Sequence, residues 1–215
     1  MRVFRLAIPA AAAAMAVAAP LLLAQKQGGA SYSVGVGGGI AVAEGALGDR
    51  FHNGYALSAE VLTLAPGAPI GIRLDGMFNH FGGSQTLINE LPSATGGSAL
   101  VYGLMLDAVL GTPKGRGFHP YGLVGFGLYM RHVSVDRTPG DTATFNDPFL
   151  GFNNRVVSAT ATNATGTETV FGTHFGGGVS VGLGPVSIFV ETRYHVIHTD
   201  VEHTHILPFT AGLRF

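Results

Sequence analysis

Seven charged residues stand singly within apolar or glycine-rich stretches of this chain, and they are the first candidates for chemistry. They are Glu60, Arg73, Asp75, Asp107, Arg131, Glu191 and Arg193. Ionisable groups in apolar surroundings can form a path for protons or ions. They can also form a paired network, because a carboxylate removed from water needs a partner, and arginine can bind it through two parallel hydrogen bonds.

Four histidines lie within eleven residues near the end of the chain and form a second candidate site. They are His195, His198, His203 and His205. Neutral imidazoles bind zinc and copper, and His203 and His205 would share one face of a strand. His195 and His198 would point to opposite faces of a regular strand, and the spacing fixes no acidic ligand. A solvated loop of histidines is therefore the favoured interpretation, with a metal site as the alternative.

The charged candidates occur in segments that alternate apolar with small or polar residues. This period of two indicates β-strands whose two faces meet different surroundings. Near the chain end, Phe209, Leu213 and Phe215 belong to the apolar row, and Thr210 and Arg214 belong to the other row. Eight such strands are expected, over residues 31–43, 55–64, 70–78, 98–111, 118–135, 169–182, 186–196 and 207–215.

The connections between these strands alternate between long and short. Residues 44–54, 84–97 and 136–168 are long, rich in turn-forming residues, and expected to be loops. Short turns at one end and longer loops at the other are typical of outer-membrane barrels.

The longest connection, residues 136–168, is expected to carry any recognition function. It contains Phe145, Phe149 and Phe152, which would be exposed unless they pack locally, fold back over a barrel mouth or meet a partner. A binding surface and a fold-back over the mouth both remain open at this point.

The start of the chain predicts export. Arg2 and Arg5, followed by an Ala- and Leu-rich run, predict a signal peptide over residues 1–24, with cleavage after Ala24 or, as second choice, Ala18. Residues 25–215 then form one domain.

Composition narrows the class of protein further. After removal of the signal peptide, ten basic and thirteen acidic residues remain, and the net charge of −3 argues against nucleic acid as a partner. The chain has no cysteine, which excludes the disulfide scaffolds. Mean hydropathy is +0.35, yet after the signal peptide no uninterrupted apolar run reaches the roughly 18 residues of a spanning helix. A transmembrane barrel explains this combination, because only half of each strand meets lipid.

On these features the region 25–215 resembles the small eight-stranded bacterial outer-membrane β-barrel family, the OmpA/OmpX-like proteins. The resemblance implies an all-β, antiparallel, up-and-down barrel in the outer membrane, with the terminal aromatic Phe215 as the signal read by the assembly machinery. Eight strands close without an unpaired edge, as lipid requires, and leave room inside for side chains only. A paired network is therefore the favoured interpretation of the seven charges. Because the chain has no Trp, the interfacial girdles are expected from Tyr55, Tyr102, Tyr121, Tyr194, Phe209 and Phe215.

A weaker resemblance is to the lipid A deacylases, eight-stranded barrels that hydrolyse an acyl ester from the membrane face with a late His-x-Ser pair. The stretch RYHVIHTD lies in a similar place. However, Ile197 and Asp200 stand two residues after the histidines, so the serine nucleophile is missing. A soluble lipocalin-like barrel would need a polar outward face, whereas the outward rows here are Leu, Val, Ile and Phe.

We therefore predict a non-enzymatic, monomeric outer-membrane barrel with a structural or surface-recognition role carried by its extracellular loops. A lipid-modifying enzyme is the alternative. The expected partners are outer-membrane lipids, lipopolysaccharide and the barrel assembly machinery, with no nucleic acid. No cofactor, metal or catalytic residue is expected.

Overall fold

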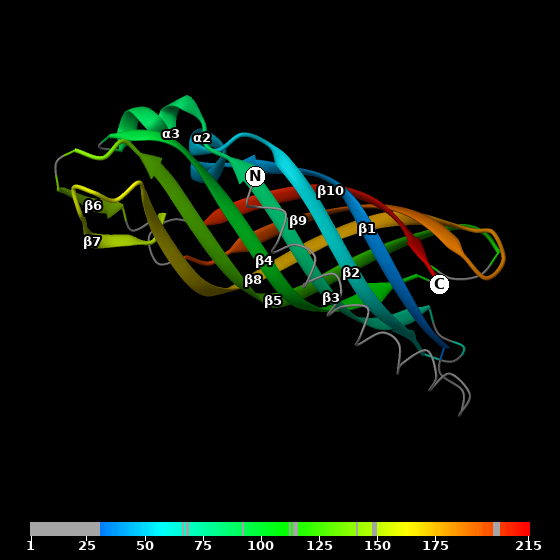
Figure 1. Cartoon of the computed structure of the whole chain (residues 1–215). Coiled ribbons are helices and arrows are strands. Elements are labelled where there is room, and N and C mark those ends of the chain that lie inside the picture. The colour runs from blue at the N-terminus through cyan, green and yellow to red at the C-terminus, as the bar shows by residue number, and fades with distance from the viewer. Residues whose placement is uncertain are drawn as a thin grey trace.

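The computed structural model describes residues 31–215 apart from positions 66, 68, 92, 112, 114, 115, 141, 148, 149 and 200–202. The expected signal peptide, residues 1–24, lies outside the described residues. Within the described residues, eight strands close into one antiparallel barrel in the order β1-β10-β9-β8-β5-β4-β3-β2 (Figure 1). The expected eight-stranded up-and-down barrel is thereby confirmed.

The elements fall into two groups. The barrel strands are β1 (Ser31–Glu44), β2 (Gly54–Leu64), β3 (Ile70–Gly82), β4 (Ala94–Leu110), β5 (Gly117–Arg137), β8 (Asn163–Gly182), β9 (Ser187–Ile197) and β10 (Thr204–Arg214). The other elements are α2 (Ala46–Arg50), α3 (Gln85–Glu90), β6 (Ala143–Asp147) and β7 (Phe152–Val157). All four of these lie at one end of the barrel, here called the loop end, and the other end is the turn end (Figure 1).

The barrel closes between its first and last strands. Ile40 faces Phe209 and Val36 faces Leu213 across β1 and β10. Phe215 extends this pairing, because its N–H donates to the carbonyl of Val34 at 2.8 Å and its carbonyl accepts from the Val34 N–H at 3.1 Å. Each barrel strand thus pairs on both sides, as a structure in lipid requires of its backbone.

Alternation along the strands gives the barrel an apolar outer face. On β3 the outward Leu74 is 46% exposed, whereas its neighbours Arg73 and Asp75 are each 1% exposed. Outward Leu104 and Phe126 repeat this pattern on β4 and β5. No helix among the described residues is long and apolar enough to span a membrane.

One of the expected girdle residues faces inward. Tyr121 is 6% exposed and its hydroxyl donates to Glu191 at 2.7 Å. The alternation of β5 explains this correction, because Tyr121 belongs to the same row as Leu123 and Gly125, which also face the interior. The other five girdle residues lie in outward rows.

The expected loop over residues 136–168 is largely ordered into strands. Pairing of β5 with β8 continues to Asp136 and Asn163, and β6 and β7 form a hairpin between them. Phe145 and Phe152 are buried with their ring centroids 5.4 Å apart, whereas Phe149 lies outside the described residues. The fold-back alternative is therefore the one that the structure adopts for these two rings.

The elements at the loop end, here called the cap (α2, α3 and the β6–β7 hairpin), share one apolar core with the barrel. Leu47 of α2, Leu87 of α3 and Phe152 of β7 belong to the same buried cluster as the inward Val133 and Val135 of β5. Ion pairs also link the cap elements. Arg50 contacts Glu90 at 2.8 Å and Asp147 at 3.5 Å.

Candidate functional site

Six of the seven predicted charged residues meet inside the barrel, where they are joined by an arginine from the last strand. We call this group the ionic cluster, and it consists of Glu60, Arg73, Asp75, Asp107, Glu191, Arg193 and Arg214. No member is more than 6% exposed. Strands β2, β3, β4, β9 and β10 each contribute at least one member, so the cluster ties together distant parts of the chain.

Arg73 is the hub of the ionic cluster. Its Nη1 donates to Glu60 Oε2 at 2.8 Å and to Glu191 Oε2 at 2.7 Å, and its Nε donates to Asp107 Oδ2 at 2.9 Å. One guanidinium therefore serves three carboxylates from three strands. This geometry satisfies the requirement that charges removed from water be paired and hydrogen-bonded.

Arg193 serves a second side of the cluster. Its Nη2 donates to Asp75 Oδ2 at 2.8 Å, and its Nε contacts Glu191. The second carboxylate oxygen of Asp75, Oδ1, has no hydrogen-bond partner among the described residues. Asp75 therefore depends on one arginine for its main pairing.

Arg214 joins the cluster from the last strand. Its Nε donates to Glu60 Oε1 at 2.6 Å, and its Nη1 donates to the carbonyl of Pro113 at 3.1 Å. The guanidinium also lies over the rings of Tyr121 and Phe189, at 5.4 and 4.9 Å from their centroids. Such contacts stabilise a cation more strongly when it is shielded from water.

A chain of hydrogen bonds extends from the ionic cluster toward the loop end. His174 Nε2 lies 2.6 Å from Asp107 Oδ1, and the Tyr129 hydroxyl lies 3.1 Å from His174 Nδ1 and 2.9 Å from His195 Nδ1. The cluster has four carboxylates and three guanidiniums, and His174 supplies an additional donor to one of the carboxylates. These hydrogen bonds fix the positions of Asp107, His174, Tyr129 and His195 inside the barrel.

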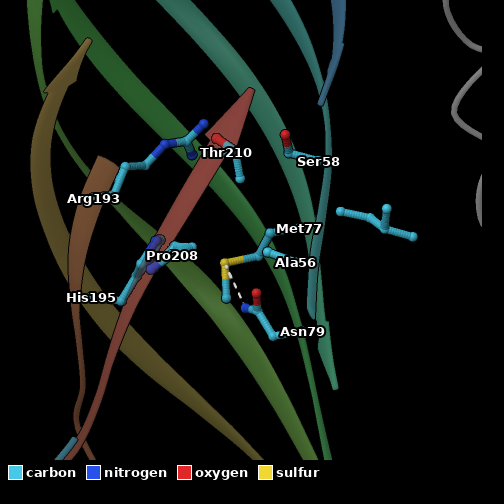
Figure 2. Close-up of a pocket in the computed structure, with 9 residues that line it drawn as sticks. Ala56, Ser58, Met77, Asn79, Arg193, His195, Pro208 and Thr210 are labelled. Carbon is cyan, nitrogen blue, oxygen red and sulfur yellow. Dashed lines mark hydrogen bonds between the residues drawn. The ribbon is translucent and has the colours of Figure 1, made fainter. Parts of the chain in front are cut away.

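A small cavity lies beside the histidine end of this chain. It is lined by Ala56, Leu57, Ser58, Met77, Asn79, Arg193, His195, Pro208 and Thr210 (Figure 2). Asn79 donates through Nδ2 to Met77 Sδ at 3.7 Å, whereas its Oδ1 has no partner among the described residues. Among the described residues, the hydrogen bond of His195 is to the Tyr129 hydroxyl, which is not part of the cavity lining.

Arg131 does not join the ionic cluster. Its Nη2 donates to Glu168 Oε2 at 2.8 Å and its Nη1 to Thr204 Oγ1 at 2.9 Å. Gly125 of the same strand faces Asp107, and Arg131 lies six residues further along β5, about 20 Å at the usual rise of a strand. Sharing an inward row was therefore not sufficient to bring Arg131 to the cluster.

The four predicted histidines separate into two groups. His195 is 1% exposed and lies in the interior chain described above. His198, His203 and His205 lie outside, at the loop end, with the His198 and His203 ring centroids 4.9 Å apart. Among the described residues, no group of three or more His, Cys, Asp or Glu side chains has the geometry to hold a metal ion.

Four participants in the interior site were not among the predicted site residues: Tyr121, Tyr129, His174 and Arg214. Arg214 stands in the polar row of the last strand and Tyr129 in the inward row of β5, so alternation carried a usable signal for both. His174 lies in a glycine-rich strand in which small residues occupy much of both rows, so its facing was not evident.

Comparison with known proteins identifies the fold. No family model matches the sequence, and no curated protein matches it. The structure is similar to that of Neisserial surface protein A, with a TM-score of 0.55 and 18% identity over 87% of this chain and 98% of that chain. It is also similar to a major outer membrane protein from Thermus thermophilus, with a TM-score of 0.51 and 14% identity over 86% of this chain and 99% of that chain.

These similarities, together with the closed barrel and its apolar outer face, define the class of protein. The chain has the fold of the small eight-stranded outer-membrane β-barrels. A barrel of this kind belongs in the bacterial outer membrane, which is the location that the sequence predicted.

Proposed function

We propose that this protein is a non-enzymatic barrel of the outer membrane whose cap presents a preformed surface for recognition outside the cell. The observation that carries the proposal is the packing of the cap. Phe145 and Phe152 are buried at 1% and 0% exposure, and they join the helices and the barrel in one apolar cluster. A surface held by such a core keeps its shape before a partner arrives, which lowers the entropic cost of binding.

The interior supports a recognition role over conduction. The ionic cluster fills the middle of the barrel with paired side chains. Toward the turn end it is followed by a buried apolar group that includes Leu62, Val109 and Leu123. Toward the loop end it is followed by the apolar cluster shared with the cap. An eight-stranded barrel has an interior just wide enough for side chains, and the described side chains occupy it on both sides of the ionic cluster.

The outer face of the cap supplies a surface of a definite kind. Thr144, Asn146 and Asn154 of the hairpin are exposed, and Val156, the register partner of Thr144, is 67% exposed. This face combines uncharged hydrogen-bonding groups with a solvent-facing apolar side chain. That chemistry suits a partner recognised by amide and hydroxyl contacts better than one recognised by charge.

The experiment is an adhesion assay with cells that display the protein. Binding to a panel of immobilised saccharides and matrix proteins is compared between the parent and a variant with Asn146→Lys and Val156→Lys. A matched control places the same two charges on α3 as Gln85→Lys and Asn89→Lys. We expect the hairpin variant to lose binding by about tenfold or more, as for a disrupted interface centre, and the α3 variant to retain it. Equal losses in both variants would argue against the hairpin face.

A lipid-modifying enzyme remains the second candidate because of one observation on the outer face. His132 Nδ1 lies 2.7 Å from the Thr167 hydroxyl at the loop end, on the side that faces lipid. A hydroxyl beside an imidazole is the start of an acyl-transfer site, but no carboxylate among the described residues binds the other ring nitrogen. Mass spectra of lipid A from cells with and without the gene decide between the candidates. If lipid A loses an acyl chain in cells with the parent protein and keeps it in cells with the Thr167→Val variant, the result would favour the enzyme.

A further inference from the structure

The histidines are distributed very unevenly between the two ends of the barrel. Of the nine in the chain, His174 and His195 are interior and His119 lies at the turn end. The other six lie at the loop end, and five of these belong to the rim of the barrel wall. We call these five the histidine collar, and they are His80, His132, His198, His203 and His205.

The collar marks the upper limit of the apolar outer face. On four strands the outward apolar row ends, toward the loop end, with a histidine. On β3, Phe78 is followed in this row by His80, and on β5, Met130 is followed by His132. The ends of β9 and β10 repeat the pattern. At the turn end, the limit of the apolar outer face has no comparable set of histidines among the described residues.

The collar rings are held in place by their neighbours. Three imidazoles are stacked, with interplanar angles of 13–22°, on aromatic rings of adjacent strands: His80 on Tyr55, His198 on Phe171 and His205 on Tyr194. A fourth, His132, is fixed by its contact with Thr167. The collar therefore presents ring N–H groups from a rigid support.

Among the described residues, few other charged groups face the collar. Glu44 is the register partner of His205, and the phenols of Tyr55 and Tyr194 stack against collar rings. At this boundary, no outward residue of the described barrel strands is Lys or Arg. Among the described residues of the barrel wall, the imidazoles are thus the groups at this height that can carry a positive charge toward an anion.

We propose that the histidine collar binds the phosphate groups of lipid headgroups in the outer leaflet. Phosphates of a lipid lie directly beyond its acyl chains, which is where the collar lies relative to the apolar face. A neutral imidazole donates from one ring nitrogen, whereas a protonated imidazole donates from both and carries a positive charge. Binding should therefore strengthen as pH falls. This inference is independent of the recognition role proposed for the cap.

The test uses the full refolded chain in micelles of an uncharged detergent. Native mass spectrometry measures retention of a short-chain phosphatidate, with diacylglycerol of the same chain length as the ligand control and inorganic phosphate as a separate arm. A variant with His80, His132, His198, His203 and His205 all changed to Gln is compared with the parent. The control variant is His119→Gln at the turn end, and heat-modifiable migration verifies folding of each protein.

We expect the parent to bind phosphatidate about tenfold more tightly at about pH 5 than at about pH 8, and the collar variant to lose this gain. Diacylglycerol should bind both proteins equally, and His119→Gln should behave as the parent. The proposal is overturned if the folded collar variant retains phosphatidate as the parent does. It is also overturned if inorganic phosphate alone saturates the collar as tightly as phosphatidate, because the site would then not be a lipid site. If the five-fold variant does not fold, the single change His198→Gln, at an exposed ring, must by itself weaken phosphatidate binding.

Discussion

The barrel and the cap differ in where they place polar and apolar side chains. In the barrel, the ionic cluster lies inside and Leu, Val, Ile and Phe cover the outside. In the cap, Leu47, Leu87, Phe145 and Phe152 lie inside, and most exposed residues are polar, among them Thr, Asn, Gln, Asp49 and Glu90. Both regions belong to one chain and share one apolar cluster at their junction.

The difference shows that each region is organised by the solvent it faces. Lipid surrounds the barrel wall, so apolar side chains are stable on the outside, and polar side chains that turn inward must find partners there. Water surrounds the cap, so burial of apolar area stabilises it in the usual way. The same substitution should therefore have different consequences in the two regions.

The largest effect is expected from Arg73→Met at the hub of the ionic cluster. This change leaves Glu60, Asp107 and Glu191 with a buried unmatched charge, and loss of one member of a buried ionic group costs about 3–5 kcal/mol. Denaturant unfolding of the refolded barrel in micelles measures the loss. Arg131→Met, which removes a partner from the 21% exposed Glu168, is the matched control and should cost less. Equal costs would mean that the cluster has no special role.

The cap should lose nearly as much from removal of a core ring, but the loss should remain local. Phe152→Ala deletes a fully buried side chain, and such changes cost about 3–5 kcal/mol. Because β5 and β8 pair independently of the hairpin, the barrel should still show heat-modifiable migration. Limited proteolysis should cut the cap of the variant faster than that of the parent. Failure of the barrel to assemble would show that the cap is needed for closure.

A charge on the lipid-facing wall is the next test. Leu106 is 42% exposed on the outer face of β4, and Leu106→Arg should cost about 2–4 kcal/mol because the guanidinium must enter hydrocarbon. Refolding titrations into lipid vesicles measure this cost. A tolerated Leu106→Arg would indicate that this part of β4 does not face hydrocarbon.

A double-mutant cycle can separate pairing from packing within the ionic cluster. Arg193 and Asp75 are joined at 2.8 Å, and residues in one ionic network couple by about 1–3 kcal/mol. The cycle compares Arg193→Met, Asp75→Leu and the double variant by denaturant unfolding. We expect the double variant to be less destabilised than the sum of the single variants. Simple additivity would contradict a paired network.

The smallest effect is expected on the water-facing side of the cap. Val156 is 67% exposed, and Val156→Arg should change the free energy of unfolding by less than about 0.5 kcal/mol. Both Val156→Arg and Leu106→Arg introduce the same side chain, so comparing them in one unfolding assay separates the effect of the surrounding solvent from that of the residue type. A loss as large as at Leu106 would mean that Val156 is covered in the folded protein.

The sequence predicted the barrel better than the cap for a physical reason. Alternation assigned Glu60, Arg73 and Asp107 to the interior, because lipid outside and side chains inside impose a strict period of two. The position of each charge along its strand is not encoded by that period, so Arg131 was wrongly grouped with the cluster. Tyr121 was assigned outward by its residue type, although its row pointed inward.

The cap left little local signal in the sequence. The helices α2 and α3 have five and six residues, too few to show a helical period, and the strands β6 and β7 have five and six. Elements of this length are stabilised by tertiary packing more than by their own propensity. The aromatic residues Phe145 and Phe152 were a usable indication of a buried core, but their partners Leu47 and Leu87 came from loops that looked unstructured.

The separation of ionic partners along the chain bears on how the molecule folds. Arg73 and Glu191 are 118 residues apart, and Glu60 and Arg214 are 154 apart. Contacts of such long range form late and slow the search for the native topology. A partly assembled sheet would hold carboxylates without their arginines, so intermediates are disfavoured and closure should be cooperative. Once the barrel has closed, separating β1 from β10 also requires loss of the Arg214–Glu60 pair, so the same ions that delay folding should give the finished barrel a long lifetime.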